Sequence, residues 1–430
     1  MIAEVKLWGN TIGAASIDDT AVCAFEYAIP FQSSGIEPSP ITMPLGSLVY
    51  RFPNLPRSSF QGLPGLLADA LPDKFGNALI DAWLATQGRT ADSFNAIERL
   101  CYIGTRGMGA LEFEPTQNPV STKSETVEIS HLVKLASEIL KHRNSLQTHF
   151  GKNDTAALSD ILRVGTSAGG ACAKAVIAWN PQTKEVRSGQ INPGSGFSHY
   201  LLKFDGVESN QDKELSNPKG YTSVEYAYHL MATDAGVEMT PCDLLVENDR
   251  HHFLTKRFDR TDTGQKIHMQ SLAALNHFDF NLAGAYSYEQ AFLTIRRLGL
   301  GMDAVEQQFR RMCFNIVARN QDDHVKNIAF LMNKKGRWFL SPAYDVTYAY
   351  NPSGRWTSAH QMTMNGKQDD FTLTDFKTTA KSALMKRGRA ETILREVTDI
   401  VSQWPTYANQ ANTPKAWTKQ IAQTHRLNIN

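Results

Sequence analysis

A short segment in the last third of the chain holds the residue types that phosphoryl transfer requires. Residues 322–327 read DDHVKN, so that Asp322 stands five positions before Asn327. The catalytic loop of a protein kinase uses this spacing to place a proton-accepting aspartate beside a metal-binding asparagine. Within the segment, His324 either orients the neighbouring backbone or transfers protons. Lys326 either approaches a transferring phosphoryl group or faces water.

A further carboxylate is expected to converge on this segment. Residues 328–332 and 338–340 are apolar and flank NKKG at 333–336, which predicts a β-hairpin. A hairpin returns the chain close to its starting point, so Asp345 in PAYD (342–345) should lie near Asn327. A carboxylate and an amide oxygen that converge suit Mg²⁺, which prefers oxygen ligands and shares its shell with phosphates. The alternative is that Asp322 and Asp323 only cap a loop after a helix.

Small residues upstream offer a place for phosphates. Residues 165–171 read GTSAGGA, and the backbone N–H groups of such a segment can approach an anion closely. The segment is not a Walker A loop, because no GxxxxGK[ST] occurs in the chain. Lys203 stands near the end of an apolar strand expected at 200–204. Its partner is a nucleotide phosphate, Glu225 on the following helix, or water.

The same residues allow two hydrolase interpretations. Gly165, Ser167 and Gly169 fit the GxSxG elbow of serine hydrolases, but here the expected strand follows the loop, which is the wrong order. A metal-dependent phosphohydrolase would use Asp322, Asp323, His324 and Asp345. That interpretation gives Lys203 and the glycine-rich segment no task.

The elements around these residues change in kind along the chain. Strands are expected at 5–8, 22–27 and 48–52, and helical periodicity begins at Pro64, with Asp73 capping the helix after Pro72. A helix at 132–140, strands at 175–179 and 200–204, a helix at 223–235 and a hairpin of 244–247 with 253–257 follow. From about residue 263 the pattern is mainly helical, with an apolar stripe at 305–317. The segment 114–126 is polar, contains two prolines and is interpreted as a linker.

Composition bounds the class of protein. The chain has 430 residues, with 44 Lys and Arg against 43 Asp and Glu, a net charge of +1. The length predicts two or three packed units, and the neutral balance argues against binding nucleic acid mainly through bulk charge. Five isolated cysteines, without CxxC spacing, argue against a zinc ribbon or a disulfide framework. Without a signal peptide or a long apolar run, the protein is expected to be cytoplasmic.

Taken together, these segments resemble the HipA family, the toxin kinases of bacterial type II toxin–antitoxin modules. Residues 63–73 (LPGLLADALPD) are similar to the family's N-terminal unit. Residues 167–174 (SAGGACAK) are similar to its SxxGxxxK element, and residues 322–327 and 342–345 match its DxHxKN and PxYD motifs. The resemblance covers most of the chain, and the two C-terminal motifs are the most specific.

The resemblance implies an α+β, two-lobed protein-kinase-like fold. Residues 1–115 would form the HipA-type N-terminal subdomain, 127–262 the β-rich ATP-binding lobe, and 263–430 the mainly helical lobe with the catalytic and metal-binding loops. ATP and Mg²⁺ are the implied cofactors. A DNA-binding antitoxin is the implied partner and would make most of the DNA contacts.

The resemblance also implies roles for single residues. Asp322 and Lys326 would be catalytic, with Asp322 as the base, and Asn327 and Asp345 would bind Mg²⁺. Lys203 would contact the ATP phosphates, Lys256 and Phe258 would belong to the adenine-binding hinge, and Ser167 would be autophosphorylated. The remaining implied ATP-binding residues are His324 and the loop residues Ala168, Gly169, Gly170 and Ala171.

Two departures from the family pattern stand out. Cys172 and Ala173 replace a common Arg-Pro pair, and Asp323 replaces a small residue, where its carboxylate would bias metal binding or face water. The sequence therefore predicts a protein serine/threonine kinase that arrests growth by phosphorylating a translation-related protein, an aminoacyl-tRNA synthetase by resemblance. The alternatives are a kinase of a small molecule, a metal-dependent phosphohydrolase and a catalytically silent binding module.

Overall fold

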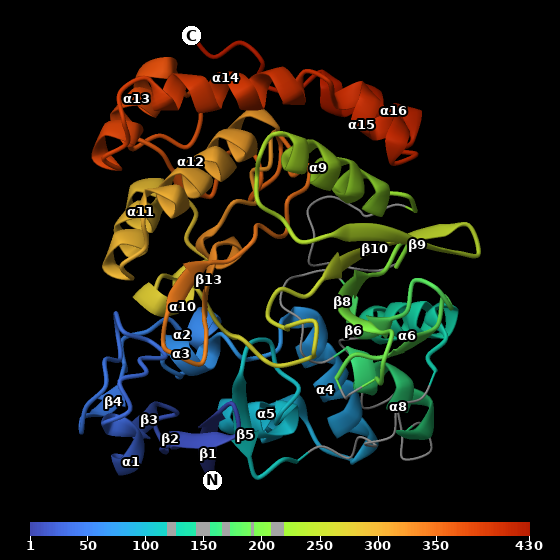
Figure 1. Cartoon of the computed structure of the whole chain (residues 1–430). Helices are drawn as coiled ribbons and strands as arrows, with labels where there is room; N and C mark the ends of the chain where they lie inside the picture. Colours follow the sequence, from blue (N-terminus) through green and yellow to red (C-terminus); the bar gives the residue numbers. More distant parts are fainter. Residues whose placement is uncertain (118–125, 143–154, 166–172, 191–192, 208–218) are drawn as a thin grey trace. The chain divides into compact units, whose positions relative to one another are not determined.

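The computed structural model describes residues 1–117, 126–142, 155–165, 173–190, 193–207 and 219–430 (Figure 1). The chain divides into two units. Unit 1 comprises residues 1–219, 243–269 and 332–336, and unit 2 comprises residues 220–242, 270–331 and 337–430. No helix in the described part of the chain is both long enough and apolar enough to cross a membrane.

The first sheet of unit 1 has the strand order β4-β3-β2-β1-β5. Its strands are β1 (Ile2–Leu7), β2 (Asn10–Ile17), β3 (Cys23–Tyr27), β4 (Val49–Arg51) and β5 (Leu111–Glu114), and all neighbours are antiparallel. Strands β1, β3 and β4 lie where the sequence predicts them. Strands β2 and β5 were not expected, because β2 is built of small residues and β5 has only four.

Helices occupy the connections between β3 and β4 and between β4 and β5. They are α1 (Ile29–Gln32), α2 (Arg57–Phe60), α3 (Gly65–Ala68), α4 (Lys74–Thr86) and α5 (Ala96–Ile103), with a 3₁₀ turn at Ala91–Ser93. The Asp73 side chain accepts a hydrogen bond from the Gly76 N–H at 2.6 Å and caps α4, as predicted. Asn95 and Glu98 form a reciprocal capping box that begins α5.

The second sheet of unit 1 has the order β7-β6-β8-β10-β9. Its strands are β6 (Lys174–Trp179), β7 (Val186–Ser188), β8 (Ser198–Lys203), β9 (Cys242–Glu247) and β10 (Arg250–Lys256). The turn between β9 and β10 places Asn248 and Asp249 at positive φ, 47° and 59°, which is the geometry of a tight hairpin. The predicted hairpin is confirmed.

One apolar core joins this sheet to three helices. The helices are α4, α6 (Ile129–Lys141) and α8 (Thr155–Val164), and their buried side chains pack with Ala175, Ile177, Leu202 and Leu254 of the sheet. Figure 1 shows α4, α6 and α8 gathered beside β6 and β8. Helix α4 therefore belongs to the core of the second sheet, although it comes from the first 115 residues.

Unit 2 is mainly helical. Its helices are α9 (Thr222–Asp234), α10 (Leu272–Asn276), α11 (Tyr288–Arg297), α12 (Met302–Val317), α13 (Leu373–Ser382), α14 (Arg389–Val401), α15 (Trp404–Gln410) and α16 (Lys415–Ala422). The apolar stripe of α12 is buried, as the sequence predicts, and α11 and α14 pack against it.

Short strands interrupt these helices. Strands β11 (His268–Ser271), β13 (Ala329–Met332) and β14 (Trp338–Leu340) form a sheet in the order β11-β13-β14. Strands β12 (Tyr286–Ser287) and β15 (Met362–Thr363) form a parallel pair. The predicted hairpin after residue 327 corresponds to β13 and β14.

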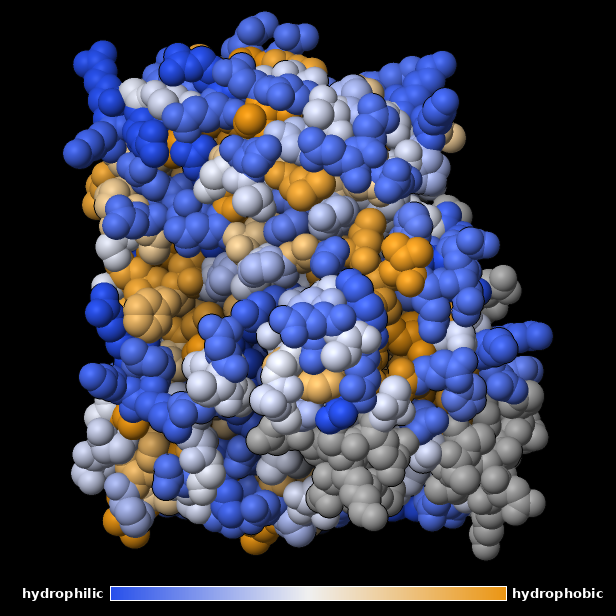
Figure 2. Space-filling view, turned by 45° about the vertical axis from the view of Figure 1, so that its right-hand side comes forward, coloured by the Kyte–Doolittle hydropathy of each residue, from blue (hydrophilic) through white to orange (hydrophobic). Residues whose placement is uncertain are grey.

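Hydrophilic residues predominate on the face drawn in Figure 2, where apolar residues gather in separate patches.

Candidate active site

The segment 322–327 forms a tight loop that ends in a single 3₁₀ turn, Val325–Asn327. The Asn327 side-chain amide donates to the Asp322 carbonyl at 2.9 Å, and the Asn327 backbone N–H donates to the His324 carbonyl at 2.8 Å. Because the NH₂ group of Asn327 is used inside the loop, its amide oxygen is the group left for an outside partner.

Asp322 keeps an accessible carboxylate. Its side chain is 49% exposed, and His324 Nε2 lies 3.8 Å from Asp322 Oδ1. His324 Nδ1 accepts a hydrogen bond from the Lys326 backbone N–H at 3.3 Å, so the proton of a neutral His324 lies on Nε2 and faces Asp322. His324 therefore orients the loop backbone, and Asp322 is open to a hydroxyl group.

The loop containing Asp345 is tied to this segment. The Tyr344 hydroxyl donates to the Lys326 carbonyl at 2.6 Å, although 18 residues separate them. Asp345 follows directly, is partly buried and has φ = +54°, a left-handed conformation that non-glycine residues adopt rarely.

The Lys326 ammonium lies 4.8 Å from the centre of the Phe280 ring, a cation–π distance.

Asp323, in contrast, is buried. It is 3% exposed and accepts hydrogen bonds from the Tyr288 hydroxyl (2.6 Å), the His360 ring Nδ1 (2.8 Å) and the Gln361 backbone N–H (2.8 Å). Burial alone would raise the pKa of Asp323, but the charge and hydrogen bond of His360, with the other two donors, lower it below its usual range. Of the two expectations for Asp323, exposure to water is wrong, because the side chain is buried and accepts three hydrogen bonds that anchor the loop.

A small cavity lies behind the same loop. Its lining includes Asp323, His324, Asn327 and Tyr344, together with Arg311 of α12. Arg311 donates to the Ser341 carbonyl at 2.6 Å, and burial lowers the pKa of its guanidinium to about 10. Arg311 therefore fixes the start of the segment that leads to Asp345.

The donor set of this site fits a hard cation. No three His, Cys, Asp or Glu side chains converge on a metal position among the residues that the structure describes. Mg²⁺ at a phosphoryl-transfer site usually takes one or two protein oxygens and completes its shell with phosphates and water. The Asn327 amide oxygen and the Asp345 carboxylate are donors of that kind.

In unit 1, Lys203 ends β8, the middle strand of its sheet. Lys203 lies opposite Lys174 of β6 on one side and opposite Phe253 of β10 on the other, and it is 8% exposed. It is therefore a central-strand lysine and not a solvated lysine at a sheet edge. The predicted loop residues Ser167, Ala168, Gly169, Gly170 and Ala171, and also Cys172, lie outside the described residues.

The predicted hinge begins where β10 ends. Lys256 forms an ion pair with Asp262 at 2.7 Å, and Phe258 is partly buried. Between them, the Arg257 backbone N–H donates to the His199 carbonyl at 2.9 Å, which continues the pairing with β8. The side chain of Lys256 is therefore directed to a neighbouring loop carboxylate.

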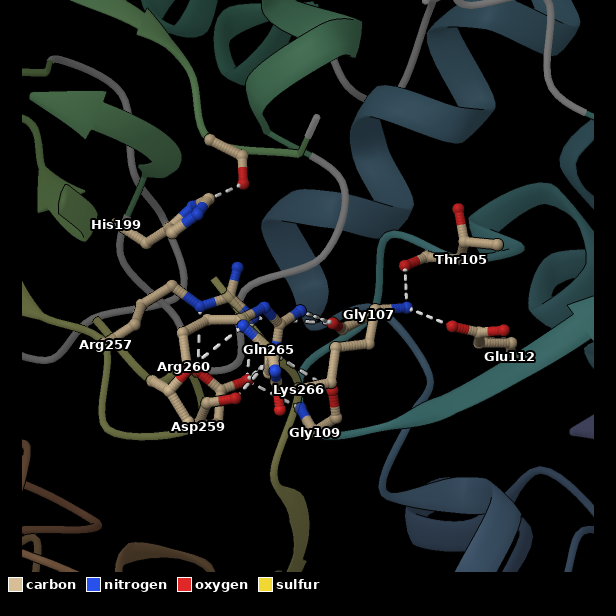
Figure 3. A network of polar contacts seen from close by, with 12 residues as sticks. Thr105, Gly107, Gly109, Glu112, His199, Arg257, Asp259, Arg260, Gln265 and Lys266 are labelled. Atoms are coloured by element: carbon tan, nitrogen blue, oxygen red, sulfur yellow. Dashed lines mark hydrogen bonds and ion pairs between the residues drawn. The ribbon is translucent and has the colours of Figure 1, made fainter. Parts of the chain in front are cut away.

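A buried aspartate fastens this hinge to the first 115 residues (Figure 3). Asp259 is fully buried and accepts from Arg257 (2.7 and 2.8 Å), from Arg260 (2.9 Å) and from the Gly109 backbone N–H (2.7 Å). Burial alone would raise the pKa of Asp259, but the charges of Arg257 and Arg260 outweigh it and lower this pKa below its usual range. Sequence reasoning missed this network, whose signal was the charged run KRFDR at 256–260.

Comparisons with protein families give two matches along the chain. Residues 3–114 match the HipA N-terminal domain, and residues 166–404 match the HipA-like C-terminal domain. No curated protein matches the chain.

Solved structures show the fold. The HipA structure from Shewanella oneidensis MR-1, in a complex of HipA, HipB and operator DNA, covers 98% of this chain and 96% of its own. Its TM-score is 0.68 at 18% identity, so the likeness is one of fold, and the predicted α+β, kinase-like fold class is confirmed. The proinflammatory kinase CtkA from Helicobacter pylori covers 60% of this chain and 92% of its own, with a TM-score of 0.34 and 11% identity.

Proposed function

Because this chain belongs to the HipA family, we propose that it is an ATP-dependent protein serine/threonine kinase that acts as the toxin of a type II toxin–antitoxin module. The observation that carries the proposal is the loop 322–327. It presents the half-exposed Asp322 carboxylate and leaves the Asn327 amide oxygen for an outside partner, and the loop ending in Asp345 is tied to it through Tyr344.

In the proposed reaction Asp322 orients the hydroxyl of a target serine or threonine and accepts its proton. The hydroxyl oxygen forms a bond to the γ-phosphorus of ATP, the bond from that phosphorus to the β–γ bridging oxygen breaks, and ADP leaves. Asn327 and Asp345 would hold Mg²⁺, which when bound would neutralise phosphate charge. Lys203 contacts the ATP phosphates, and the backbone after β10 holds the adenine. Catalysis then comes from positioning and electrostatic stabilisation, which is how phosphoryl-transfer enzymes generally work.

Ser167 is proposed as an autophosphorylation site. A phosphoserine adds about −1.5 to −2 charges at neutral pH. Within a segment that receives ATP phosphates, this charge competes with the nucleotide. Autophosphorylation at Ser167 would therefore switch off ATP binding.

The proposed partner is a DNA-binding antitoxin, since the Shewanella HipA of similar fold was solved with HipB and operator DNA. With a net charge of +1, this chain has no large charge excess for DNA, so the antitoxin is expected to make most of the DNA contacts. The proposed target is a translation-related protein, an aminoacyl-tRNA synthetase by family resemblance.

The test is a labelling experiment with purified protein, Mg²⁺ and [γ-³²P]ATP, followed by mapping of the phosphorylated residue. Label on Ser167 is expected in the unaltered chain, and Asp322→Asn should reduce its rate of appearance about 10²-fold or more. Asp399→Asn, which changes an exposed carboxylate on α14, is the matched control and should label normally. Ser167→Ala should remove the labelled site.

The outcomes separate the proposal from its alternatives. Release of inorganic phosphate without label on any protein would favour a phosphohydrolase. Label on an added small molecule but not on protein would favour a small-molecule kinase. Failure of the unaltered, Ser167-unmodified protein to bind ATP would overturn the kinase proposal.

A further inference from the structure

A buried ion pair links the N-terminal segment of the chain to the sheet that carries Lys203. Lys174 begins β6, and its ammonium nitrogen lies 3.9 Å from Asp73 Oδ2. Both side chains are almost completely buried, with exposed fractions of 2% for Lys174 and 4% for Asp73. A lysine is almost never found so deeply buried unless it is paired with an opposite charge. Asp73 provides that charge for Lys174.

Lys174 lies beside Lys203. The two residues are directly opposite each other in the antiparallel pairing of β6 with β8, so their side chains leave the same face of the sheet. The helical core packs on the other face, through Ala175 and Leu202 among others. Lys174 and Lys203 are both buried, and like charges directly opposite on neighbouring strands repel each other. The negative charge of Asp73, close to Lys174, offsets part of this repulsion.

Asp73 is rigidly held. Its Oδ1 accepts the capping hydrogen bond from Gly76 at the start of α4, and its Oδ2 is the oxygen closest to Lys174. Helix α4 itself packs, through Phe75 and Leu79, in the core beneath the sheet. The distance of 3.9 Å is too long for a direct hydrogen bond, so Asp73 acts on Lys174 mainly through its charge.

We propose that Asp73 is a positioning residue for the phosphate-binding lysines of this kinase. Its carboxylate holds the Lys174 ammonium in place beside Lys203, so that both ammonium groups face the phosphates of ATP. The inference rests on the proposed function and adds a residue of the N-terminal subdomain to its nucleotide site. Asp73 does not touch the nucleotide, and it acts through Lys174.

Asp73→Asn separates this role from helix capping. Asparagine caps helices as well as aspartate does, so the bond from Gly76 is kept while the charge beside Lys174 is lost. The matched control is Asp81→Asn on the same helix, which removes a carboxylate paired with Arg99 at 2.8 Å and away from Lys174. Thermal unfolding of both variants shows whether the fold is retained.

The measurement is ATP binding without Mg²⁺, by isothermal titration calorimetry, together with steady-state phosphorylation. Asp73→Asn is expected to raise the Kd and the KM for ATP about tenfold, while kcat at saturating ATP stays within about threefold of the unaltered protein. Asp81→Asn should change neither constant by more than about twofold. A residue that only stabilised the fold would not give this division between KM and kcat.

A double-mutant cycle tests whether Asp73 acts through Lys174. In a Lys174→Met background, Asp73→Asn should change the Kd for ATP by less than about twofold, because the group that Asp73 positions is gone. An unreduced tenfold effect in that background would overturn the inference. Equal Kd values for Asp73→Asn and Asp81→Asn, or tighter binding by Asp73→Asn, would overturn it as well. If the unaltered protein does not bind ATP, the proposed function fails and the inference fails with it.

Discussion

Asp322 and Asp323 are adjacent carboxylates with opposite surroundings. Asp322 is half exposed, whereas Asp323 is buried against Tyr288, His360 and Gln361. A site built for proton transfer from a substrate needs one accessible acceptor, held on a backbone that does not move. If Asp322 is the proposed proton acceptor, the three hydrogen bonds to Asp323 meet the second requirement, because they hold the adjacent backbone in place.

Removal of one of these donors should therefore affect both stability and turnover. Tyr288→Phe deletes a hydroxyl that donates to Asp323 and accepts from Asn315. We expect the free energy of unfolding to fall by about 1–3 kcal/mol. We also expect kcat to fall about tenfold or more through misplacement of the loop, while the Kd for ATP is unchanged.

Urea unfolding and steady-state kinetics measure the two effects of Tyr288→Phe. Tyr350→Phe is the control, because its ring stacks with Arg319 and its hydroxyl makes no hydrogen bond among the described residues. A stability loss with unchanged kcat would show that Asp323 does not position the loop.

The sequence predicted Asp322, Asn327 and Asp345 because their motifs are local and a hairpin connects them. It could not predict Tyr288 or His360, which lie 35 and 37 residues from Asp323 and contact it only in the folded chain. The sequence also shows Asp323 beside Asp322, but the charge of its side chain suggested exposure to solvent rather than burial. Burial with three donors is a tertiary property that no local pattern encodes.

Among the helices and strands, those specified by local sequence patterns were predicted, and those fixed by contacts with distant segments were not. The hairpins β9–β10 and β13–β14 and the stripe of α12 were predicted because turn residues and periodicity are written in neighbouring positions. Strand β2 was missed because its small residues have weak strand preference, and its place is fixed by β1 and β3 on either side. The packing of α4 under β6 and β8 joins segments about 100 residues apart and has no local signal.

The junction of β6 and β7 offers a test at this scale. A Cβ on Gly189 would lie 2.5 Å from the backbone C and O atoms of Ile177 in β6. Gly189→Ala must therefore push the two strands apart, and we expect it to lower the free energy of unfolding by about 1–3 kcal/mol or more.

Gly46→Ala is the matched control for Gly189→Ala, because nothing lies within 4 Å of its added Cβ and its φ is not positive. Its effect should stay within about 0.5 kcal/mol. Denaturant unfolding followed by circular dichroism measures both variants. Equal stability of the two would show that β6 and β7 do not approach as closely as described.

At the scale of the whole molecule, buried histidines should make unit 1 sensitive to acid. Burial lowers the pKa of His268 and of His252 to about 4, and both are fully buried. In the unfolded chain these two imidazoles bind protons as the pH falls below about 6.5, whereas in the folded chain they stay neutral until about pH 4. The stability from neutral burial is thus complete above pH 6.5 and is lost as the pH falls toward 4.

At pH 5 each of these histidines should lower the free energy of unfolding by about 2 kcal/mol relative to its value at neutral pH. The figure comes from about 1.4 kcal/mol per pH unit over the roughly 1.5 units between pH 6.5 and pH 5. His268→Gln keeps a donor for the Pro38 carbonyl and should flatten the decline of melting temperature between pH 7.5 and 5. His131→Gln, at a half-exposed histidine, should leave the decline unchanged. The same slope in both variants would contradict the assignment of acid sensitivity to His268.

The path of the chain through the two units has a consequence for the order of synthesis. The chain passes between the units five times, after residues 219, 242, 269, 331 and 336. During translation, β8 remains an open edge with unpaired backbone groups until β10 has been made, and such edges favour association with other chains. Asp345 is added later still. A product released before residue 345 therefore lacks one of the two residues proposed to bind Mg²⁺.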